Sequence, residues 1–527
     1  MSAVARILRV RVERDLPVPV RGGALRADRY RPASDPRAPL VLMRTPYGRR
    51  HTGLLPELLA RRGYQVLLLS VRGTADSTGR FQGWHLDPGD AEDTLTWLRT
   101  RPWFPGAFAT WGASFLGYTQ WDLATQSAPE WKAAIIQDAP SGAYESVLYS
   151  GGAFALGDWL WWAQSMAALG RPGGESLVGN LLRIPAVTRR LKRAVWRLPL
   201  EEADIDAAGE RIDYYREWLR HPDGKDAFWR TTDHRADVPN MPPLVHLAGG
   251  WKDVFLSGTV ADAEALRASG RRVRLLIGPW AHGRGVYSRT YMREAFAFLD
   301  HALRGRGPLP PSSTKVHVSG LDAWREYASW PPEGGASRPW YLRPGGGLSP
   351  TAPEDTGAAP RAFRYDPADP TPPSGDEAVL QGFARGTVRD PRALEERDDV
   401  LVYTSEMLTE ALDLRGPVSA TLHTRADNPH RDLVVRLYDL PPEGRGHLVT
   451  YGILRLDPAT DDPARVAMRP AAHRFAPGHR LRVHICGGAF PLWDRNLGTG
   501  ERGTAMRAVT QQVFTDGDRP SALHLTT

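Results

Sequence analysis

The chain of 527 residues contains a single cysteine, Cys486. One cysteine cannot form a disulfide within the chain, and it cannot supply the paired thiolates of a Cys-x-x-Cys zinc site. Long apolar runs are also absent, since no stretch reaches the roughly 18 apolar residues of a membrane-spanning helix. Residues 1–20 contain no apolar segment of the kind found at the centre of a signal peptide. These absences predict a soluble cytoplasmic protein without membrane association.

Lysine is rare: only five of the 67 basic residues are lysines, and the others are arginines. The net charge of +7 is small for this length, and acidic residues are interspersed with the basic ones. The densest basic stretch, residues 189–197, is interpreted as one face of a helix rather than a polyanion site. The charge pattern therefore predicts no nucleic-acid partner.

Motifs for phosphate and metal chemistry are missing as well. The sequence has neither a Walker loop nor a His-Glu-x-x-His motif. Residues 498–503 match Gly-x-Gly-x-x-Gly, but a loop precedes them and a predicted strand follows. A dinucleotide site requires a strand before the glycines and a helix after them. We therefore expect no cofactor and no catalytic metal.

Short apolar runs alternate with helix-like segments in the first 310 residues. The runs are typical of strands that are buried on both faces of a parallel sheet. They lie at residues 38–45, 64–71, 108–111, 133–138, 242–250 and 272–279. Residues 87–103, with acidic residues in the first turn and apolar residues at helical spacing, are typical of the helices between them. The alternation predicts an α/β fold, a doubly wound sheet with helices on both faces.

Two other regions have a different character. Residues 146–170 and 213–229 are rich in aromatics and are predicted to be helices of a cap inserted into the sheet domain. Beyond a proline-rich break at 308–313, short alternating runs predict an antiparallel β jelly roll, with a loop at 343–360. The predicted domains are the first part of the α/β domain (1–142), the helical cap (143–229), the second part of the α/β domain (230–310) and the C-terminal jelly roll (311–527).

Ser114 lies between Gly112 and Gly117, in the segment Gly-Ala-Ser-Phe-Leu-Gly that joins a predicted strand to a helix-like stretch. This context predicts a nucleophile elbow, the sharp turn that presents a serine hydroxyl at the carboxyl edge of a sheet. The flanking glycines allow the strand and the helix to pass closely. The spacing is Gly-x-Ser-x-x-Gly instead of the commoner Gly-x-Ser-x-Gly, so the motif alone also fits a surface or capping serine.

Asp253 directly follows one predicted sheet strand, and His282 directly follows the next. Because the carboxyl ends of parallel strands share one edge of a sheet, both side chains are expected beside Ser114. A serine hydroxyl needs a base to act as a nucleophile, and the order serine, acid, histidine is that of α/β-hydrolases. The three residues therefore predict a Ser-His-Asp triad. The alternative for His282 is a loop histidine that is bonded to the backbone.

Four motifs together resemble the cocaine esterase and X-Pro dipeptidyl-peptidase family. They are "RTPYG" (44–48), "GASFLG" (112–117), "GGWKDVF" (249–255) and "GPWAHG" (278–283), and residues 401–427 and 489–500 resemble the jelly roll of the family. The resemblance covers nearly the whole chain. It implies an α/β-hydrolase domain with a helical cap and a C-terminal jelly-roll domain of the galactose-binding type.

The resemblance also assigns roles by position. It makes Ser114 the nucleophile, His282 the general base and acid, and Asp253 the residue that orients the histidine. Tyr47 matches a tyrosine whose hydroxyl joins the oxyanion hole, and it also follows a strand where this fold places the second oxyanion donor. The alternative for Tyr47 is a core tyrosine. Phe115 replaces the tyrosine that is common after the serine, and its backbone N–H is the first oxyanion donor.

Two aromatic residues are implied to bind the acyl group. Phe255, two residues after the acid, matches an acyl-pocket aromatic, and Trp162 resembles a cap tryptophan over the same pocket. For Trp162 and its neighbours Trp159 and Trp161, the helix core is the favoured alternative. An apolar slot of this kind would accept neutral acyl groups; a preference for acidic ones would instead implicate Arg216 and Arg220.

The sequence predicts a serine hydrolase that cleaves an ester or amide bond of a small-molecule substrate through an acyl-enzyme. With a histidine base, activity is expected to rise through a pKa of roughly 6.5. The alternatives are an X-Pro dipeptidyl-peptidase, an acylase of β-lactams or α-amino acid esters, and a non-catalytic carbohydrate-binding protein. A peptidase needs carboxylates for the substrate amine, for which Glu145, Asp158 and Asp213 are candidates. The oligomeric state stays open, with a homodimer among the alternatives.

Overall fold

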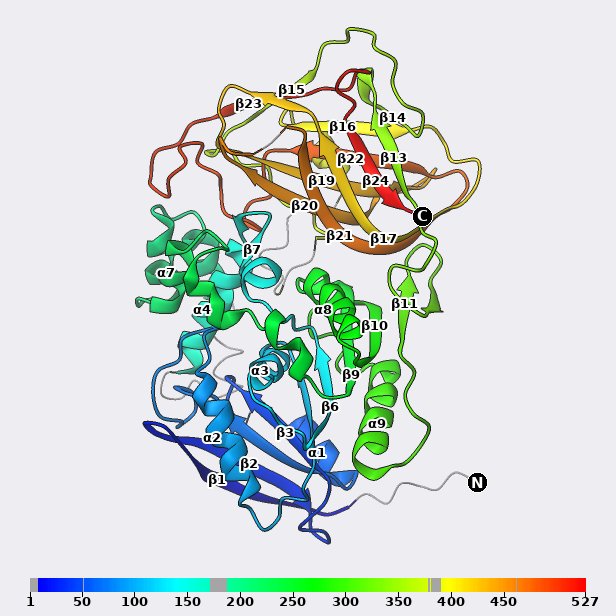
Figure 1. Ribbon diagram of the computed structural model, residues 1–527. Helices are drawn as coiled ribbons and strands as arrows, with labels where there is room; N and C mark the ends of the chain where they lie inside the picture. The colour runs from blue at the N-terminus through cyan, green and yellow to red at the C-terminus, as the bar shows by residue number, and fades with distance from the viewer. Residues whose placement is uncertain (1–7, 51, 171–186, 378–379, 381–389, 461) are drawn as a thin grey trace.

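The computed structural model of the chain describes all residues except 1–7, 51, 171–186, 378–379, 381–389 and 461. Figure 1 shows an α/β part at the bottom, a group of cap helices around α4 and α7 above its left side, and an all-β part at the top. The architecture confirms the two predicted fold classes, an α/β hydrolase for the first part and an all-β fold for the C-terminal part.

A ten-stranded sheet forms the centre of the α/β part, in the order β1-β2-β4-β3-β5-β6-β9-β10-β11-β12. The six strands predicted from apolar runs are adjacent and parallel. They are β3 (Leu40–Thr45), β4 (Gln65–Ser70), β5 (Phe108–Ala113), β6 (Trp131–Gln137), β9 (Leu244–Lys252) and β10 (Arg272–Ala281). Every residue of β3 and β4 is buried, which explains why these strands appear as continuous apolar runs.

The two edges of this sheet were not predicted. An antiparallel hairpin of β1 (Val10–Val20) and β2 (Gly23–Pro32) forms one edge. At the other edge, β11 (Ser313–Val318) pairs in parallel with β10, and β12 (Ala323–Tyr327) pairs antiparallel with β11. The α/β sheet thus continues past residue 310, where the sequence analysis begins the C-terminal domain.

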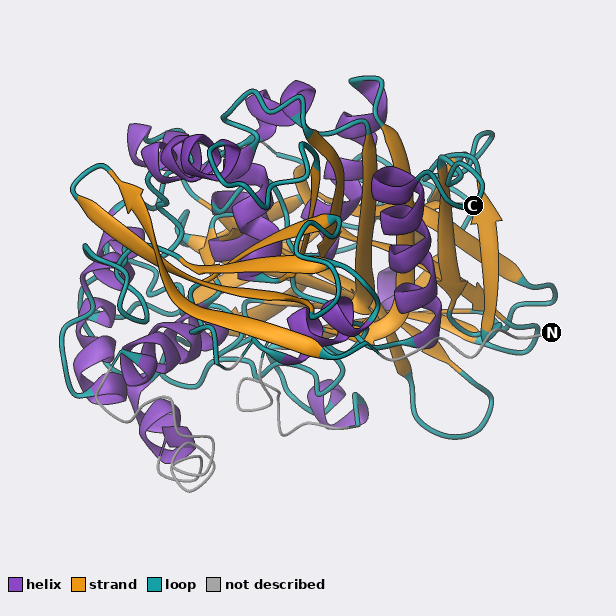
Figure 2. Cartoon of the chain, turned by 90° about the horizontal axis from the view of Figure 1, so that it is seen from below, coloured by secondary structure: helices purple, strands orange, loops and turns teal. Residues whose placement is uncertain are grey.

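Helices cover both faces of the sheet (Figure 2). On one face, α1 (Leu54–Arg61) and α9 (Arg289–Arg304) pack their apolar side chains. On the other face lie α2 (Pro88–Arg99), α3 (Phe115–Leu123) and α8 (Leu256–Ala268). The helix predicted at 87–103 begins where Asp87 caps it, since its carboxylate accepts the Gly89 N–H at 2.9 Å.

The cap differs from its prediction at its start. Residues 146–170 are not helical throughout, because a hairpin of β7 (Tyr149–Ser150) and β8 (Ala153–Phe154) precedes α4 (Leu156–Leu169). Gly151 and Gly152 make the turn with positive φ angles of 50° and 83°. The remaining elements are the π-helical turn η1 (Tyr144–Leu148), η2 (Leu200–Glu202), α6 (Ala203–Ala208), α7 (Asp213–Arg220), η3 (Ala227–Thr232) and η4 (Arg235–Asn240).

The C-terminal part is a nine-stranded sheet in the order β20-β19-β22-β16-β14-β13-β24-β17-β21. Its edge strands β20 and β21 pass so closely that a Cβ at Gly452 would lie 2.2 Å from the Ala467 carbonyl oxygen, so the sheet almost closes. Its strands are β13 (Ser337–Leu342), β14 (Gly347–Ser349), β16 (Val400–Ser405), β17 (Leu412–Leu422), β19 (Arg431–Leu440), β20 (His447–Leu456), β21 (Ala464–Phe475), β22 (Arg480–Cys486) and β24 (Ala522–Thr526).

A small sheet of β15 (Arg361–Tyr365), β23 (Val509–Val513) and β18 (Thr424–Ala426) accompanies it, together with the short helices η5 (Pro344–Gly346) and α10 (Arg392–Glu395). Strand β14 and η5 lie inside residues 343–360, which the sequence analysis wrongly assigned wholly to a loop. Two short β contacts, β14 with β13 and with β16, are enough to hold this segment in the sheet.

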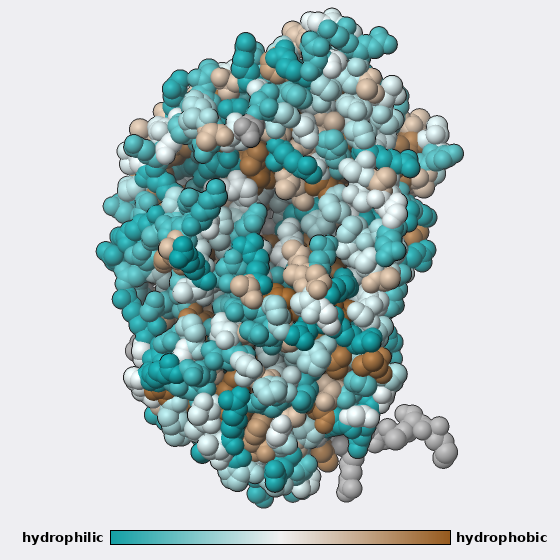
Figure 3. Space-filling view, viewed as in Figure 1, coloured by the Kyte–Doolittle hydropathy of each residue, from teal (hydrophilic) through white to brown (hydrophobic). Residues whose placement is uncertain are grey.

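The face shown in Figure 3 is mostly hydrophilic, with apolar residues in small separate groups. Across the part of the chain that the structure describes, no helix is both long and apolar enough to span a membrane. In the basic stretch 189–197, Leu191 and Ala194 are buried while Arg190 and Lys192 beside them are exposed, as on a helix with one basic face.

Candidate active site

Ser114 stands on the turn between β5 and α3, as the sequence predicts. Its backbone has φ 57° and ψ −132°, a conformation that costs a non-glycine residue energy and that active-site turns retain. The surrounding hydrogen bonds hold it there: its N–H donates to the Gln137 carbonyl at 2.9 Å, and its carbonyl accepts the Gly117 and Tyr118 N–H groups. The hydroxyl is thereby presented at the carboxyl edge of the sheet.

The two glycines of this segment are required by close contacts. A Cβ at Gly112 would lie 2.3 Å from the carbonyl oxygen of Leu116, within the turn itself. A Cβ at Gly117 would lie 2.5 Å from the Cβ of Ala139, where α3 crosses the end of β6. Both distances are far below van der Waals contact, so no other residue fits without moving the backbone.

His282 and Asp253 reach Ser114 from the ends of β10 and β9. The Nε2 atom of His282 lies 3.0 Å from the Ser114 Oγ, and its Nδ1 lies 2.9 Å from Asp253 Oδ2. The other carboxylate oxygen of Asp253 accepts the Phe255 N–H at 2.6 Å. The structure therefore brings the three residues of the predicted triad into one hydrogen-bonded chain.

The charged forms of His282 and Asp253 stabilise each other. Burial opposes a charge on His282, but the charge of the adjacent Asp253 carboxylate and its hydrogen bond to the ring outweigh that penalty, and the His282 pKa is raised to about 9. Burial likewise opposes a charge on Asp253, yet the charge and hydrogen bond of His282 hold the pKa of Asp253 below its usual range. This revises the expected histidine pKa of roughly 6.5 upward.

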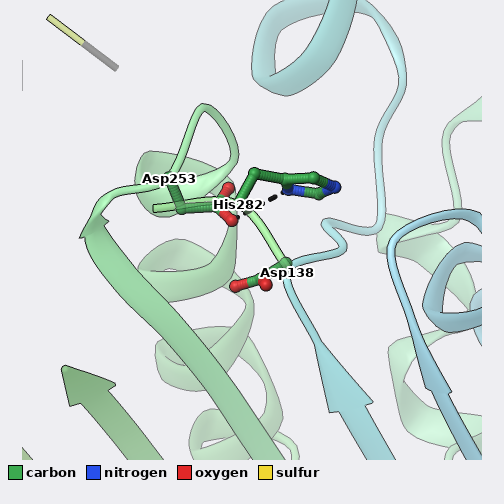
Figure 4. Close-up of side chains that lie close together, drawn as sticks. All are labelled: Asp138, Asp253 and His282. Carbon is green, nitrogen blue, oxygen red and sulfur yellow. Dashed lines mark hydrogen bonds and ion pairs between the residues drawn. The ribbon is translucent and has the colours of Figure 1, made fainter. Parts of the chain in front are cut away.

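Asp138 is a fourth side chain at this site, and the sequence analysis missed it. It follows directly on β6, as Asp253 and His282 follow their strands, and this shared placement is the signal that could have found it. Figure 4 shows its carboxyl group directed toward Asp253 and the His282 loop. The ligand atoms of these three residues lie within 4.8 Å of one another, as in a metal site. In the structure His282 Nδ1 and Asp253 Oδ2 are hydrogen-bonded to each other.

Tyr47 lies on the other side of Ser114, in the loop after β3. Its hydroxyl lies beside the Ser114 side chain and the Phe115 backbone N–H. The indole Nε1 of Trp162 in α4 donates a hydrogen bond to the same hydroxyl at 3.3 Å. Burial raises the pKa of Tyr47, so the hydroxyl keeps its proton as a hydrogen-bond donor. The two predicted oxyanion donors therefore lie together beside the serine.

Phe255 and Trp162 belong to one buried aromatic cluster around the site, with 1% and 5% of their surface exposed. The Trp162 ring stacks on Phe115 with ring centres 5.9 Å apart, and the Phe255 ring contacts His282 edge-on at 5.1 Å. Trp84 and Trp159, which the sequence analysis did not assign to the site, contact both rings. The two rings are thus parts of one cluster rather than opposite walls of an open slot. A role in acyl binding stays a prediction.

Of two cavities that share lining residues, the smaller one reaches Tyr47. A cavity of about 240 Å³ is lined by Tyr47, Thr74, Phe81 and Met166. It shares Phe81 and Met166 with a cavity of about 690 Å³ that extends along α7. A larger cavity, about 880 Å³, lies between the cap and the C-terminal part, and none of its described lining residues belongs to the triad.

The C-terminal part also contacts the site directly. The guanidinium group of Arg469 in β21 donates a hydrogen bond to the backbone carbonyl of Asp253. The same guanidinium lies over the ring of Tyr451 in the neighbouring strand β20. The C-terminal sheet therefore contacts and holds the loop that carries Asp253.

Two family models match the sequence. The model of the X-Pro dipeptidyl-peptidase (S15 family) matches residues 22–284, which include all seven predicted site residues. The model of the X-Pro dipeptidyl-peptidase C-terminal non-catalytic domain matches residues 308–524. Together they account for most of the chain.

Individual relatives agree with these models. The cocaine esterase of Rhodococcus sp. (strain MB1 Bresler) is 29% identical, with 95% of each chain covered. An aminopeptidase from the marine sediment archaeon Thaumarchaeota archaeon has a TM-score of 0.82 at 23% identity, over 99% of this chain and 97% of that one. An α-amino acid ester hydrolase has a TM-score of 0.80 at 23% identity, over 100% and 98%. The two solved structures show the same fold.

Proposed function

Because the chain belongs to the cocaine esterase and X-Pro dipeptidyl-peptidase (S15) family of serine hydrolases, we propose that it hydrolyses small carboxylic esters through an acyl-enzyme on Ser114. Hydrolysis of an ester or amide bond is the chemistry of this family. The choice of Ser114, His282 and Asp253 as its catalytic residues, and of esters as its substrates, is our proposal.

The observation that carries the proposal is the hydrogen-bonded chain from Ser114 through His282 to Asp253, with distances of 3.0 and 2.9 Å. In this arrangement neutral His282 accepts the Ser114 proton while the serine oxygen attacks the ester carbonyl. Asp253 accepts the Nδ1–H, which fixes the tautomer with a free Nε2 lone pair and stabilises the imidazolium that forms.

We assign two donors to the charge that develops on the carbonyl oxygen. The Tyr47 hydroxyl lies beside the Ser114 side chain and beside the Phe115 N–H at the start of α3. Each would donate a hydrogen bond to the tetrahedral oxyanion, and losing one such donor typically costs about 10²–10³-fold in rate. Collapse of the intermediate expels the alcohol, which takes the proton from His282, and leaves the acyl group on Ser114. Water then enters, His282 accepts its proton, and the carboxylic acid is released.

The charges around the site favour a neutral ester over a peptide with a free amine. A dipeptidyl-peptidase needs unpaired carboxylates near the serine for the substrate ammonium group. Asp213 forms ion pairs with Arg80 and Arg211. Asp158 is 2% exposed and accepts the Leu380 N–H at 2.8 Å, and Glu145 is exposed on η1. Within the described ranges these three do not come together in a cluster.

The test is covalent labelling combined with two substrates. A fluorophosphonate should modify Ser114 and abolish turnover of p-nitrophenyl acetate, and Ser114→Ala should do the same without unfolding the protein. Ser165→Ala is the matched control, because the Ser165 hydroxyl in α4 donates to the Trp161 carbonyl of its own helix at 2.8 Å and, among the described residues, bonds no residue of the site. Labelling of another residue with Ser114 unmodified would overturn the assignment.

Comparing p-nitrophenyl acetate with Ala-Pro-p-nitroanilide distinguishes the alternatives. Faster hydrolysis of the ester supports the proposal. Faster hydrolysis of the anilide would identify a dipeptidyl-peptidase, and turnover only of α-amino acid esters or β-lactams would identify an acylase. Absence of turnover with every acyl substrate would favour the non-catalytic carbohydrate-binding protein.

A further inference from the structure

Two buried carboxyl groups, those of Asp138 and Asp253, lie side by side at the catalytic edge of the sheet, with oxygen atoms within 4.8 Å of each other and of the His282 ring. Asp138 is 2% exposed and Asp253 is fully buried. Two carboxylates this close cannot both be ionised in a buried site unless cations compensate them. His282 supplies one positive charge, which already pairs with Asp253 at 2.9 Å. The Arg469 guanidinium bonds the backbone carbonyl of Asp253, and the described contacts pair it with neither carboxyl group. One of the two carboxyl groups must therefore hold a proton.

The hydrogen-bond partners indicate which carboxyl group that is. Asp253 accepts at both oxygens, from the His282 ring and from the Phe255 N–H. Its roles as acceptor require the ionised form. Asp138 accepts twice at one oxygen, Oδ2, from the Gly283 N–H and from the Gln137 side-chain amide, each at 3.0 Å. Its other oxygen is then placed to carry an O–H that donates to Asp253.

From this arrangement we propose that Asp138 is a positioning residue of the catalytic site: its carboxyl group stays neutral, donates a hydrogen bond to Asp253 and, through the Gly283 N–H, fixes the loop that carries His282. The inference rests on the proposed function, since it assigns Asp138 to the triad described above. Asp138 itself touches no reacting atom and acts through its two neighbours.

The position of Asp138 explains why this contact is rigid. The residue has a positive φ of 50°, and its own N–H donates to the Ala248 carbonyl of β9 at 2.9 Å. It therefore links the end of β6 to β9 through the backbone, and to the His282 loop through the side chain. Asp138 therefore connects the ends of β6, β9 and β10, the three strands that are followed by Asp138, Asp253 and His282.

The other ionisable groups around Asp138 agree with a neutral form. Asp253 and His282 face it from the loops after β9 and β10, and Tyr291 faces it from α9. Burial and the charge of Asp253 raise the pKa of Asp138 well above its usual range, although His282 and the Gly283 N–H oppose the shift. The Tyr291 hydroxyl is neutral as well, because burial raises its pKa.

Asp138→Asn is the decisive variant. An amide donates at one atom and accepts at the other, as the neutral acid does, and asparagine tolerates positive φ. If Asp138 is neutral, kcat/KM for p-nitrophenyl acetate should stay within about threefold of wild type, and the pH at which activity rises should not move. If Asp138 were ionised, removing its charge would lower the His282 pKa and shift this limb to lower pH, which would overturn the proposal.

Asp138→Gly removes the carboxyl group while keeping a backbone that accepts positive φ. Loss of the support for Asp253 and the His282 loop should lower kcat by on the order of 10–100-fold with KM nearly unchanged. Thermal unfolding measures any general loss of stability. Asp262→Asn is the control, because Asp262 is also a buried aspartate, which bonds Ser141 and lies outside the site. A kcat of Asp138→Gly equal to that of wild type would overturn the proposal.

Labelling of Ser114 separates this proposal from the proposed function. If Ser114→Ala retains turnover, the proposed function fails. If Ser114→Ala is inactive and fluorophosphonate labels Ser114, but Asp138→Gly reacts as fast as wild type, only the role of Asp138 fails.

Discussion

The indole Nε1 of Trp162 donates a hydrogen bond to the hydroxyl of Tyr47 at 3.3 Å. An indole N–H is only a donor, so the Tyr47 oxygen is the acceptor and its own proton must point elsewhere. The remaining neighbours of this hydroxyl are Ser114 and the Phe115 N–H. The Phe115 N–H is also a donor, so the Tyr47 proton is left to face Ser114. Trp162 therefore contacts Tyr47 through a hydrogen bond, a contact that its expected role as an acyl-pocket wall did not include.

Tyr47→Phe should raise the activation free energy by about 2–4 kcal/mol and lower kcat accordingly, because it removes one oxyanion donor and keeps the ring. KM and the melting temperature should barely change. Steady-state kinetics and thermal unfolding of the same preparation measure both. A drop of several degrees in melting temperature with an unchanged kcat would instead identify a core tyrosine.

Trp162→Phe removes one hydrogen bond that orients the Tyr47 hydroxyl. Such a bond contributes about 0.5–1.5 kcal/mol, so kcat should fall by roughly twofold to tenfold. The aromatic ring remains, so packing against Phe115 is largely kept. The informative measurement is the double variant: in the Tyr47→Phe background, Trp162→Phe should cause no further loss of kcat. Additive losses would show that Trp162 acts independently of Tyr47.

The pH dependence of kcat/KM should follow His282. The base must be neutral to accept the serine proton, and its pKa is raised to about 9 by Asp253, which outweighs burial. Activity should therefore increase with pH, about tenfold per unit well below the pKa, and level off toward pH 9. His282→Ala should remove this limb and most of the activity. A profile that is already flat above pH 6 would contradict a histidine held in the cationic form.

Gly112→Ala should destabilise the protein and abolish most activity, because the added Cβ would lie 2.3 Å from the Leu116 carbonyl oxygen inside the elbow. Backbone must move to relieve this contact, and Ser114 moves with it. Gly503→Ala is the matched control, since a Cβ there meets no atom within 4 Å and its φ is not positive. Thermal unfolding and turnover of p-nitrophenyl acetate are measured for both. Equal effects of the two substitutions would refute the steric argument.

The sequence was sufficient for the sheet centre because its strands are buried on both faces and therefore appear as apolar runs. The hairpin β1–β2 escaped detection because it lies at the edge, where exposed and buried residues alternate irregularly. The turn at Gly151 was misread for a related reason. Its aromatic neighbours fit a helix, and only the close approach of β20, whose Ile453 carbonyl oxygen would lie 2.0 Å from a Cβ at Gly151, favours the hairpin.

In the site, too, some residues could be predicted from the sequence and others could not. Ser114, Asp253 and His282 follow strands directly, so topology alone predicts that they meet. Asp138 also follows a strand, but a second aspartate has no place in the expected triad, and nothing in the sequence indicates a proton shared between two carboxyl groups. The Trp162–Tyr47 hydrogen bond joins residues 115 positions apart and depends on how the cap packs. Such contacts between separate elements require the folded structure.

Phe255 has two potential roles, and the acyl chain of the substrate distinguishes them. Its N–H donates to Asp253 at 2.6 Å, and its ring contacts His282 edge-on with centres 5.1 Å apart. Substitution by alanine keeps the N–H and removes the ring. If the ring binds the acyl group, Phe255→Ala should reduce kcat/KM for butyryl and benzoyl esters by about 1–3 kcal/mol more than for the acetyl ester, because acetate has too few carbons to lose these contacts.

The control for this measurement is Phe255→Leu, which keeps an apolar side chain of similar reach. It should restore most of the activity toward the butyryl ester, but less of that toward the flat benzoyl ester. An equal loss for all chain lengths in Phe255→Ala would mean that the ring only supports His282, and the loss should then appear in kcat alone. A wild-type preference for acidic acyl groups would reject an apolar acyl site, because burying an unpaired carboxylate among these rings would cost several kcal/mol. Arg216 and Arg220 would then be the residues to substitute, starting with Arg220, whose side chain is more exposed than that of Arg216.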